Sequence, residues 1–228
     1  MKYTKLLLSS ALLASSLQLA QAATITLAGD PIGGGQIITG NFTIAPQGEI
    51  GGQNSTPGSG NENAQFAIDG VVGTKYLNFG ELNTGYIVTP TIGLSNVTGL
   101  TITTATGAFE DARDPLTFSL FGSNTAVAST VPGATYDLST FTLIVADAVT
   151  GLATDPGRGQ TAPTQTFTNV NDFTTYVLVF PTIRNAGAAN SMQVAEAILS
   201  GTAVPEPSSL ALLGLGALGL VTRRRRNA

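Results

Sequence analysis

The sequence predicts an all-β sandwich, and three observations lead to this class. Thr, Val, Ile, Phe and Gly are prominent along the chain, and charged residues make up only 11% of it. The apolar runs are short and are separated by Gly, Pro and Asn, which favour turns. Short runs of β-branched and aromatic residues between such turns are typical of antiparallel sandwiches. No cysteine is present, so the apolar core must supply most of the stability.

Nine segments are expected to be strands because of their β-branched and aromatic content. In chain order they are residues 24–27, 37–44, 86–89, 98–104, 117–123, 140–146, 165–167, 176–180 and 192–200. Residues 177–180 are apolar at every position, which predicts a central strand covered on both faces. Residues 194–199 have some helix propensity, but a closing strand is preferred because a helix would have little to cap it. Residues 51–60 are expected to form a long exposed loop.

The N-terminus has the pattern of a secretory signal peptide. Lys2 and Lys5 precede an apolar stretch at residues 6–19, and the small residues Ala20 and Ala22 stand where signal peptidase reads the chain. We therefore expect residues 1–22 to be removed by signal peptidase and the exported chain to begin at position 23.

The C-terminus has the pattern of a short membrane segment. Residues 208–222 contain no charge and would span roughly 22 Å as a helix, less than a hydrocarbon core about 30 Å thick. Bilayer thinning and extended arginine side chains could absorb the difference. The four arginines that follow would stay in the cytoplasm and leave the preceding chain outside. The alternative is a buried core helix with a basic tail, which the Gly-rich run disfavours.

The order of these C-terminal parts resembles a PEP-CTERM sorting signal. Its motif residues are Pro205, Glu206, Pro207, Arg223, Arg224, Arg225 and Arg226. The resemblance implies recognition by an exosortase, removal of the tail near the Pro-Glu-Pro motif, and a Gram-negative bacterium that makes exopolysaccharide. Two prolines around a carboxylate also keep the motif extended, where an enzyme could reach it. The expected organisation is a signal peptide at 1–22, one domain at 23–203 and a sorting signal at 204–228.

Composition excludes several functions for the exported part. Between positions 23 and 207 there are 14 acidic residues and four basic ones, a net charge of about −10. The basic residues are Lys75, Arg113, Arg158 and Arg184. So acidic a body argues against nucleic acid as a partner and favours a divalent cation. The absence of His and Cys excludes Ser-His-Asp and Cys-His catalysis and removes the commonest zinc ligand.

Asp69 and Gly70 predict a tight turn whose carboxylate and carbonyl oxygens point into one small region. Calcium takes six to eight such oxygens, many from the backbone. Most Asp-Gly pairs are only turns, so both interpretations stay open at this point.

Several motifs together resemble a discoidin or galactose-binding-like domain of the coagulation-factor C-type family. They are Ala-Ile-Asp-Gly at 67–70, Thr-Lys-Tyr-Leu-Asn-Phe at 74–79, Arg-Asp-Pro at 113–115, residues 118–124, 167–169, 173, 176–180 and 190–196. The resemblance spans about residues 24–202 and implies a jelly-roll sandwich. It also implies a structural calcium ion held by Asp69, Thr74 and Glu196. Val71 and Val72 stand where many members carry Asp or Asn, so a weakened site and no site both remain open.

Arg113 and Arg184 have two interpretations each. Either could form an ion pair that fastens a loop to a strand, or could present paired donors to a sugar hydroxyl or carboxylate. Tyr76 and Phe79 stand where many relatives carry tryptophan, and we expect them to fill the core.

Glu110, Asp111 and Asp114 are the clustered carboxylates, but close neighbours on one loop do not give the separated pair that glycoside hydrolysis needs. The sequence therefore predicts a non-catalytic, exported protein of the cell surface or exopolysaccharide matrix. It would be carbohydrate-binding or structural and anchored transiently in the inner membrane. The alternative is an envelope enzyme that modifies polysaccharide with acidic residues.

Overall fold

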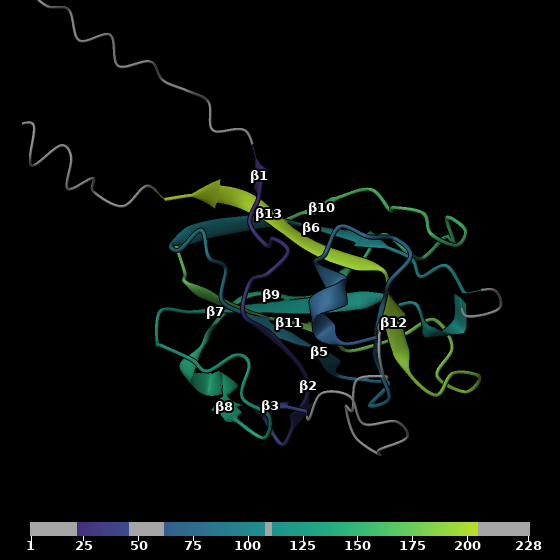
Figure 1. Cartoon of the computed structure of the whole chain (residues 1–228), viewed down its shortest axis with the longest axis horizontal. Coiled ribbons are helices and arrows are strands. Elements are labelled where there is room, and N and C mark those ends of the chain that lie inside the picture. The colour runs from purple at the N-terminus through teal and green to yellow at the C-terminus, as the bar shows by residue number, and fades with distance from the viewer. Residues whose placement is uncertain (1–21, 46–61, 108–110, 205–228) are drawn as a thin grey trace, which may run out of the picture.

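The computed structural model describes residues 22–45, 62–107 and 111–204, which form an antiparallel β-sandwich (Figure 1). One sheet has four strands in the order β1-β13-β6-β10, and the other has seven in the order β8-β3-β2-β5-β11-β7-β9. Strands β12 and β4 form a separate pair. The all-β class is confirmed.

The strands of the four-stranded sheet are β1 (Ala23–Thr24), β13 (Glu196–Ala203), β6 (Ser95–Thr103) and β10 (Gln165–Thr166). Those of the seven-stranded sheet are β8 (Thr135–Asp137), β3 (Asn41–Ile44), β2 (Ile32–Ile38), β5 (Thr84–Val88), β11 (Thr175–Phe180), β7 (Thr117–Ser123) and β9 (Thr142–Val149). The small pair is β12 (Met192–Val194) and β4 (Tyr76–Asn78). Three single 3-10 turns complete the described elements: η1 (Ala64–Ala67), η2 (Asp111–Arg113) and η3 (Leu138–Thr140).

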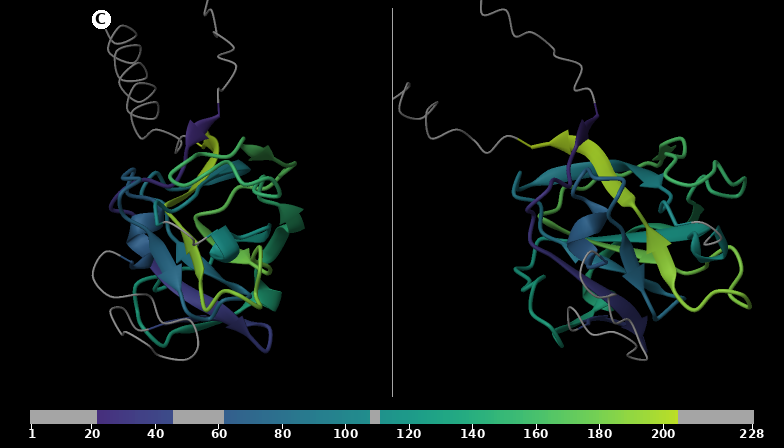
Figure 2. Two further views of the ribbon diagram at one scale, coloured as in Figure 1. Left: turned by 90° about the vertical axis from the view of Figure 1, so that its right-hand side faces the viewer. Right: turned by 45° about the vertical axis from the view of Figure 1, so that its right-hand side comes forward.

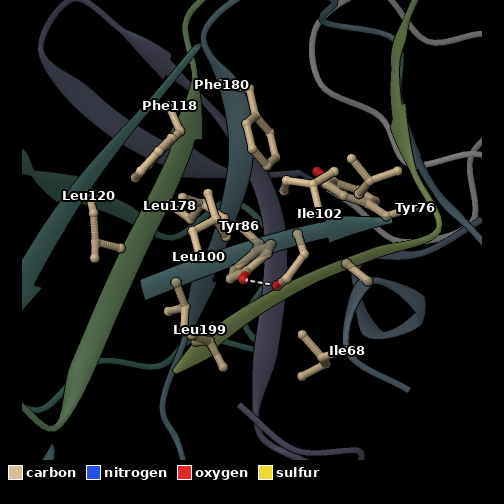
Figure 3. Close-up of a cluster of buried hydrophobic side chains, with 14 of the residues drawn as sticks. Ile68, Tyr76, Tyr86, Leu100, Ile102, Phe118, Leu120, Leu178, Phe180 and Leu199 are labelled. Atoms are coloured by element: carbon tan, nitrogen blue, oxygen red, sulfur yellow. Dashed lines mark hydrogen bonds between the residues drawn. The ribbon is translucent and has the colours of Figure 1, made fainter. Parts of the chain in front are cut away.

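The main core lies between the two sheets. Leu100 and Ile102 of β6 and Leu199 of β13 face Tyr86, Leu178 and other side chains of the larger sheet, all fully buried (Figure 3). The hydroxyl of Tyr86 donates a hydrogen bond of 2.5 Å to the carbonyl of Ala197, which joins the sheets across the core. Burial raises the pKa of Tyr86, with the nearby Glu196 as the next contribution, so this hydroxyl stays a neutral donor.

A second core lies on the other face of the seven-stranded sheet. Val177 and Val179 of β11 alternate with the inward-facing residues of that strand and pack with Phe42, Ile44 and Leu138. This face is covered by η3 and by partly buried residues on either side of it, such as Val127 and Phe141. β11 pairs with β5 on one side and β7 on the other, so the expected central strand is confirmed.

The segment 37–44, expected as one strand, is a hairpin, so that prediction was wrong. Thr39 and Gly40 both have positive φ, at 49° and 81°, which forms the two-residue turn between β2 and β3. The expected strand 192–200 is also interrupted, because Ala195 leaves β12 and donates its N–H to Thr103 of β6 at 2.9 Å. Apart from Ala195, residues 194–199 are strand and not helix, as preferred.

Several expectations fall outside the described residues. These are the signal peptide, the loop at 51–60, Glu110 and the apolar segment at 208–222. Within the described ranges, no helix is long and apolar enough to cross a membrane. The two ends of the described domain, β1 and the end of β13, leave from the same side of the sandwich (Figure 2).

Gly85 should not tolerate a side chain. A Cβ at this position of β5 would lie 1.9 Å from the carbonyl oxygen of Leu178, within the ladder between β5 and β11. Because backbone on both strands would have to shift, Gly85→Ala should lower the free energy of unfolding by about 3 kcal/mol and Tm by roughly 8 °C. Gly187→Ala is the control, since a Cβ there meets only the Asn185 side chain at 3.5 Å. Equal melting temperatures for the two variants would contradict the packing described here.

Candidate functional site

The Asp69 loop closes on itself through the Asp69 carboxylate. Oδ1 accepts the N–H of Val71 at 2.8 Å, and Oδ2 accepts the hydroxyl of Thr74 at 2.8 Å. The Val71 carbonyl accepts the Thr74 N–H at 3.0 Å, and the Thr74 hydroxyl lies 2.7 Å from it. Gly70 has a φ of 77°, which is why glycine follows the aspartate. Hydrogen bonds among its own polar groups therefore hold the loop in this conformation, and the Thr74 hydroxyl is one of these groups.

Glu196, the first residue of β13, lies beside this loop. The residue is 5% exposed, and both carboxylate oxygens are buried without a hydrogen-bond partner. Burial and, after it, the neighbouring Asp69 carboxylate raise the pKa of Glu196 to about 7, although the backbone N–H groups of Val71 and Gly70 act in the opposite direction. Two oxygens in this condition require either a proton or a cation.

A cation would satisfy this arrangement. Two carboxylates from separate segments meet here, and a buried carboxylate without a partner is costly. No group of three or more acidic, His or Cys side chains that could hold a metal occurs in the described segments, so backbone carbonyls or water would have to supply the other ligands. The residues fit a calcium ion with few charged ligands.

Asp69 also lines a cavity that the sequence did not indicate. It has a volume of about 560 Å³, and its lining includes Asp30, Gln65, Phe66, Asp69 and Thr130. The Asp30 carboxylate is occupied, because it accepts the N–H of Leu27 at 2.8 Å and both the N–H and the hydroxyl of Thr91. No motif marks these residues, since the lining comes from three separate segments, 29–32, 65–69 and 130.

The two candidate ligand-binding arginines lie where β7 begins and β11 ends. Asp114 is fully buried there and forms a paired ion bridge with Arg158, whose Nη1 donates to Oδ1 at 2.9 Å while Nη2 donates to Oδ2. These hydrogen bonds raise the pKa of Arg158. Arg184 approaches the same carboxylate at 3.8 Å and donates to the carbonyls of Leu152 and Ala153 at 2.5 and 3.3 Å. Asp114 is thus the anchor of a three-segment junction.

Arg113 lies at the end of η2, half-buried, directly before Asp114. The neighbouring Asp111 is exposed. The ion pairs formed by Asp114 in this part of the structure involve Arg158 and Arg184. The sequence identified the correct carboxylate but not Arg158, because that residue stands 44 positions away along the chain.

Tyr76 is fully buried, as expected, and Phe79 is half-buried. The Tyr76 hydroxyl donates to the Gly85 carbonyl at 2.7 Å and accepts a hydrogen bond from Asn78 at 2.6 Å. Burial raises its pKa. Lys75 pairs with Glu62 at 3.4 Å and donates to Gln193 at 3.3 Å.

Solved structures of carbohydrate-binding proteins are loosely similar to the chain. A family 32 carbohydrate-binding module of Clostridium perfringens NanJ, solved with galactose, is 14% identical over 79% of this chain and 99% of its own, with a TM-score of 0.48. A family 32 module of Streptococcus pneumoniae EndoD is 12% identical over 78% and 98%, with a TM-score of 0.46. A fucolectin from striped bass serum is 14% identical over 84% and 53%, at 0.45. At these scores none of them assigns a ligand to this chain.

No curated protein is significantly similar to the chain. One family model matches it, that of the PEP-CTERM protein-sorting motif, at residues 203–226. This match covers the Pro-Glu-Pro motif, the apolar run and the four arginines, and a signal of this type implies export to the envelope of a bacterium. The chain carries a PEP-CTERM protein-sorting motif directly after the last strand of its β-sandwich.

Proposed function

We propose that this is an exported, non-catalytic protein of the cell surface or exopolysaccharide matrix, sorted by an exosortase, which binds carbohydrate through its arginine-bearing end. The observation that carries the proposal is the placement of two features at opposite ends of the sandwich. The sorting motif follows the end of β13, whereas Arg113, Arg158 and Arg184 gather at the other end.

The strand pairing supports this placement. Ala203 pairs with Ser95, and Ser95 bridges to Phe173, just before β11 begins. β11 then runs about 17 Å, at roughly 3.3 Å per residue, to Phe180, close to the arginine junction. A tail attached at one end would leave the arginine end free to face polymer outside the cell.

The contacts of the carboxylates argue against the enzyme alternative. Glu196 and Asp69 lie together, but the Glu196 oxygens are buried and could not reach a glycosidic bond. Asp114 is fully buried and held by Arg158. Neither supplies an accessible acid and base on opposite sides of a substrate.

We further propose that Asp69 and Glu196 hold a structural calcium ion, with Thr74 acting through Asp69. When bound, the ion would neutralise the two carboxylates and fasten the loop to β13. The unpartnered, buried oxygens of Glu196 support this assignment.

Calcium should therefore raise the melting temperature of the protein. At a calcium concentration about 100 times Kd, the gain in unfolding free energy should be about 2.7 kcal/mol. Glu196→Gln and Asp69→Asn should remove this gain in differential scanning calorimetry, whereas Asp147→Asn, on edge strand β9, should keep it. Melting curves that coincide with calcium and with chelator would refute the site.

Protonation should oppose calcium. Because the pKa of Glu196 is raised to about 7 in the folded state, the metal-free protein should lose stability as pH rises from about 4.5 to about 7. Calcium competes with that proton, so its stabilising effect should be largest above pH 7 and fall as pH decreases through 7. In melting curves measured across this range, Glu196→Gln should remove the pH dependence of the metal-free protein's stability and the pH dependence of the calcium effect. A calcium effect of equal size at pH 5 and pH 8 would contradict this linkage.

Glycan binding should depend on the arginine-bearing end. On a glycan array with bacterial exopolysaccharides, Arg113→Ala should weaken binding about 10- to 100-fold, the value of one or two charge-assisted hydrogen bonds. Lys75→Ala is the matched control, since that residue belongs to a separate ion pair with Glu62.

Arg158→Ala should instead lower the free energy of unfolding by about 4 kcal/mol, because it removes the paired partner of the buried Asp114 carboxylate. Polysaccharide turnover abolished by Glu110→Gln would establish the enzyme alternative.

A further inference from the structure

Two apolar side chains project into solvent at the end of the sandwich from which the sorting motif leaves. Val170 is 84% exposed, the highest value among the large apolar residues of the described ranges, and Ile92 is 38% exposed. Val170 lies in the loop before β11, and Ile92 lies in the turn before β6. We refer to these two residues and their loops, 90–94 and 167–174, as the tail-side face.

The strand register places this face next to the exit of the chain. Ala203 pairs with Ser95, and Ser95 exchanges backbone hydrogen bonds with Phe173 at 2.8 and 3.0 Å. The loop of Val170 is thus two strand spacings, about 10 Å, from the end of β13. The turn of Ile92 is closer still, because the carbonyl of Leu94 accepts the N–H of Val204 at 2.9 Å.

The exposed Val170 lies in a loop that is held by hydrogen bonds. Asn169 donates to the Val97 carbonyl at 3.1 Å and accepts the N–H of Asn171 at 3.0 Å. Asn96 donates to the Asn171 carbonyl at 2.8 Å. The Asn169 side chain and the Asn171 backbone, on either side of Val170, are both hydrogen-bonded to β6, so the loop cannot easily turn the Val170 side chain inward.

The length of the connection limits how far this face can lie from a bilayer. Backbone pairing fixes Val204 to the domain, and only Pro205, Glu206 and Pro207 separate it from the uncharged segment at 208–222. The four Cα–Cα steps from Val204 to Ser208 span at most about 14 Å. The interfacial layer of one leaflet is about 6 Å thick. While that segment is in the membrane, the exit of the chain at Val204 therefore lies within about 8 Å of the outer edge of the headgroup layer.

We propose that the tail-side face docks on the surface of the lipid bilayer, with Val170 and Ile92 entering the interface, as long as the C-terminal segment is attached. This inference rests on the proposed export and anchoring. It fixes the orientation of the sandwich, because the arginine-bearing end then points away from the membrane. The described residues of this face include no Lys or Arg, and Asp172 is its acidic residue. Docking should therefore depend on apolar contact and change little with salt.

The absence of cysteine from the sequence allows a direct test with single labels. The protein with its C-terminal segment intact is labelled at Val170→Cys and inserted into phosphatidylethanolamine–phosphatidylglycerol vesicles that carry a nitroxide on the lipid headgroup. Val149→Cys is the matched control, since Val149 is a 59% exposed valine that pairs with Thr117 near the arginine-bearing end. We expect headgroup quenching at position 170 to exceed that at position 149 several-fold, at low and at high salt.

Flotation of the vesicles separates this inference from the anchoring on which it rests. If the protein does not float, anchoring fails and the docking fails with it. If the protein floats but both labels are quenched equally, only the docking is overturned. Shielding of position 170 that is seen only in membranes containing the sorting enzyme would also overturn it and would indicate a protein partner instead. Val170→Asp gives a second measurement. It should leave flotation and Tm unchanged and reduce the quenching of a label at Ile92→Cys, and unchanged quenching would also overturn the docking.

Discussion

Strand β13 is the element on which the rest of the structure depends. Its first residue, Glu196, lies beside the Asp69 loop, and its last, Ala203, leads to the sorting motif. Between these ends, β13 pairs with β6 along its length and sends Ala197 and Leu199 into the core. The hydroxyl of Tyr86 reaches the Ala197 carbonyl from the opposite sheet, one residue from the buried carboxylate. Packing between the sheets therefore fixes the position of Glu196.

The two cores explain why loops at both ends of the sandwich can be held so closely. β11 is buried on both faces, with Tyr176, Leu178 and Phe180 between the sheets and Val177 and Val179 in the second core. A strand enclosed in this way can shift little without opening one of the two cores. The Asp114 junction follows its end and the Val170 loop precedes its start, so both are attached to the most constrained element of the fold.

The sequence predicted the elements whose signals are local. Residues 177–180 and 117–123 are strands because β-branched and aromatic residues follow one another there. The hairpin at 39–40 was missed because Thr-Gly is a weaker turn signal than Asn-Gly. The start of β2 was missed because Gly33 to Gly35 have no β-forming side chains. They are needed because Cβ atoms at these positions would collide with Ser129, Tyr76 and Thr43, contacts that only the folded chain reveals.

The candidate site likewise combines features that local sequence predicted with contacts that only the folded chain reveals. The turn at Asp69 is local and was expected, whereas the approach of Glu196 came from a resemblance and not from spacing. For Asp114, the sequence suggested its neighbour Arg113, but the paired ion bridge comes from Arg158, on a loop that follows β9. A buried carboxylate pairs with the basic side chain that the fold brings close to it, and a single sequence does not show which side chain that is.

Val72, in the turn that follows Asp69 and Gly70, has a packing role in this chain. Val72 lies close to Gly159, since a Cβ on that glycine would be 3.3 Å from Val72 Cγ1. Gly159 follows Arg158 directly, so the Asp69 loop contacts the segment that holds the Asp114 junction. This apolar contact places the Asp69 loop and the arginine-bearing end, the two proposed binding regions, within one packed unit.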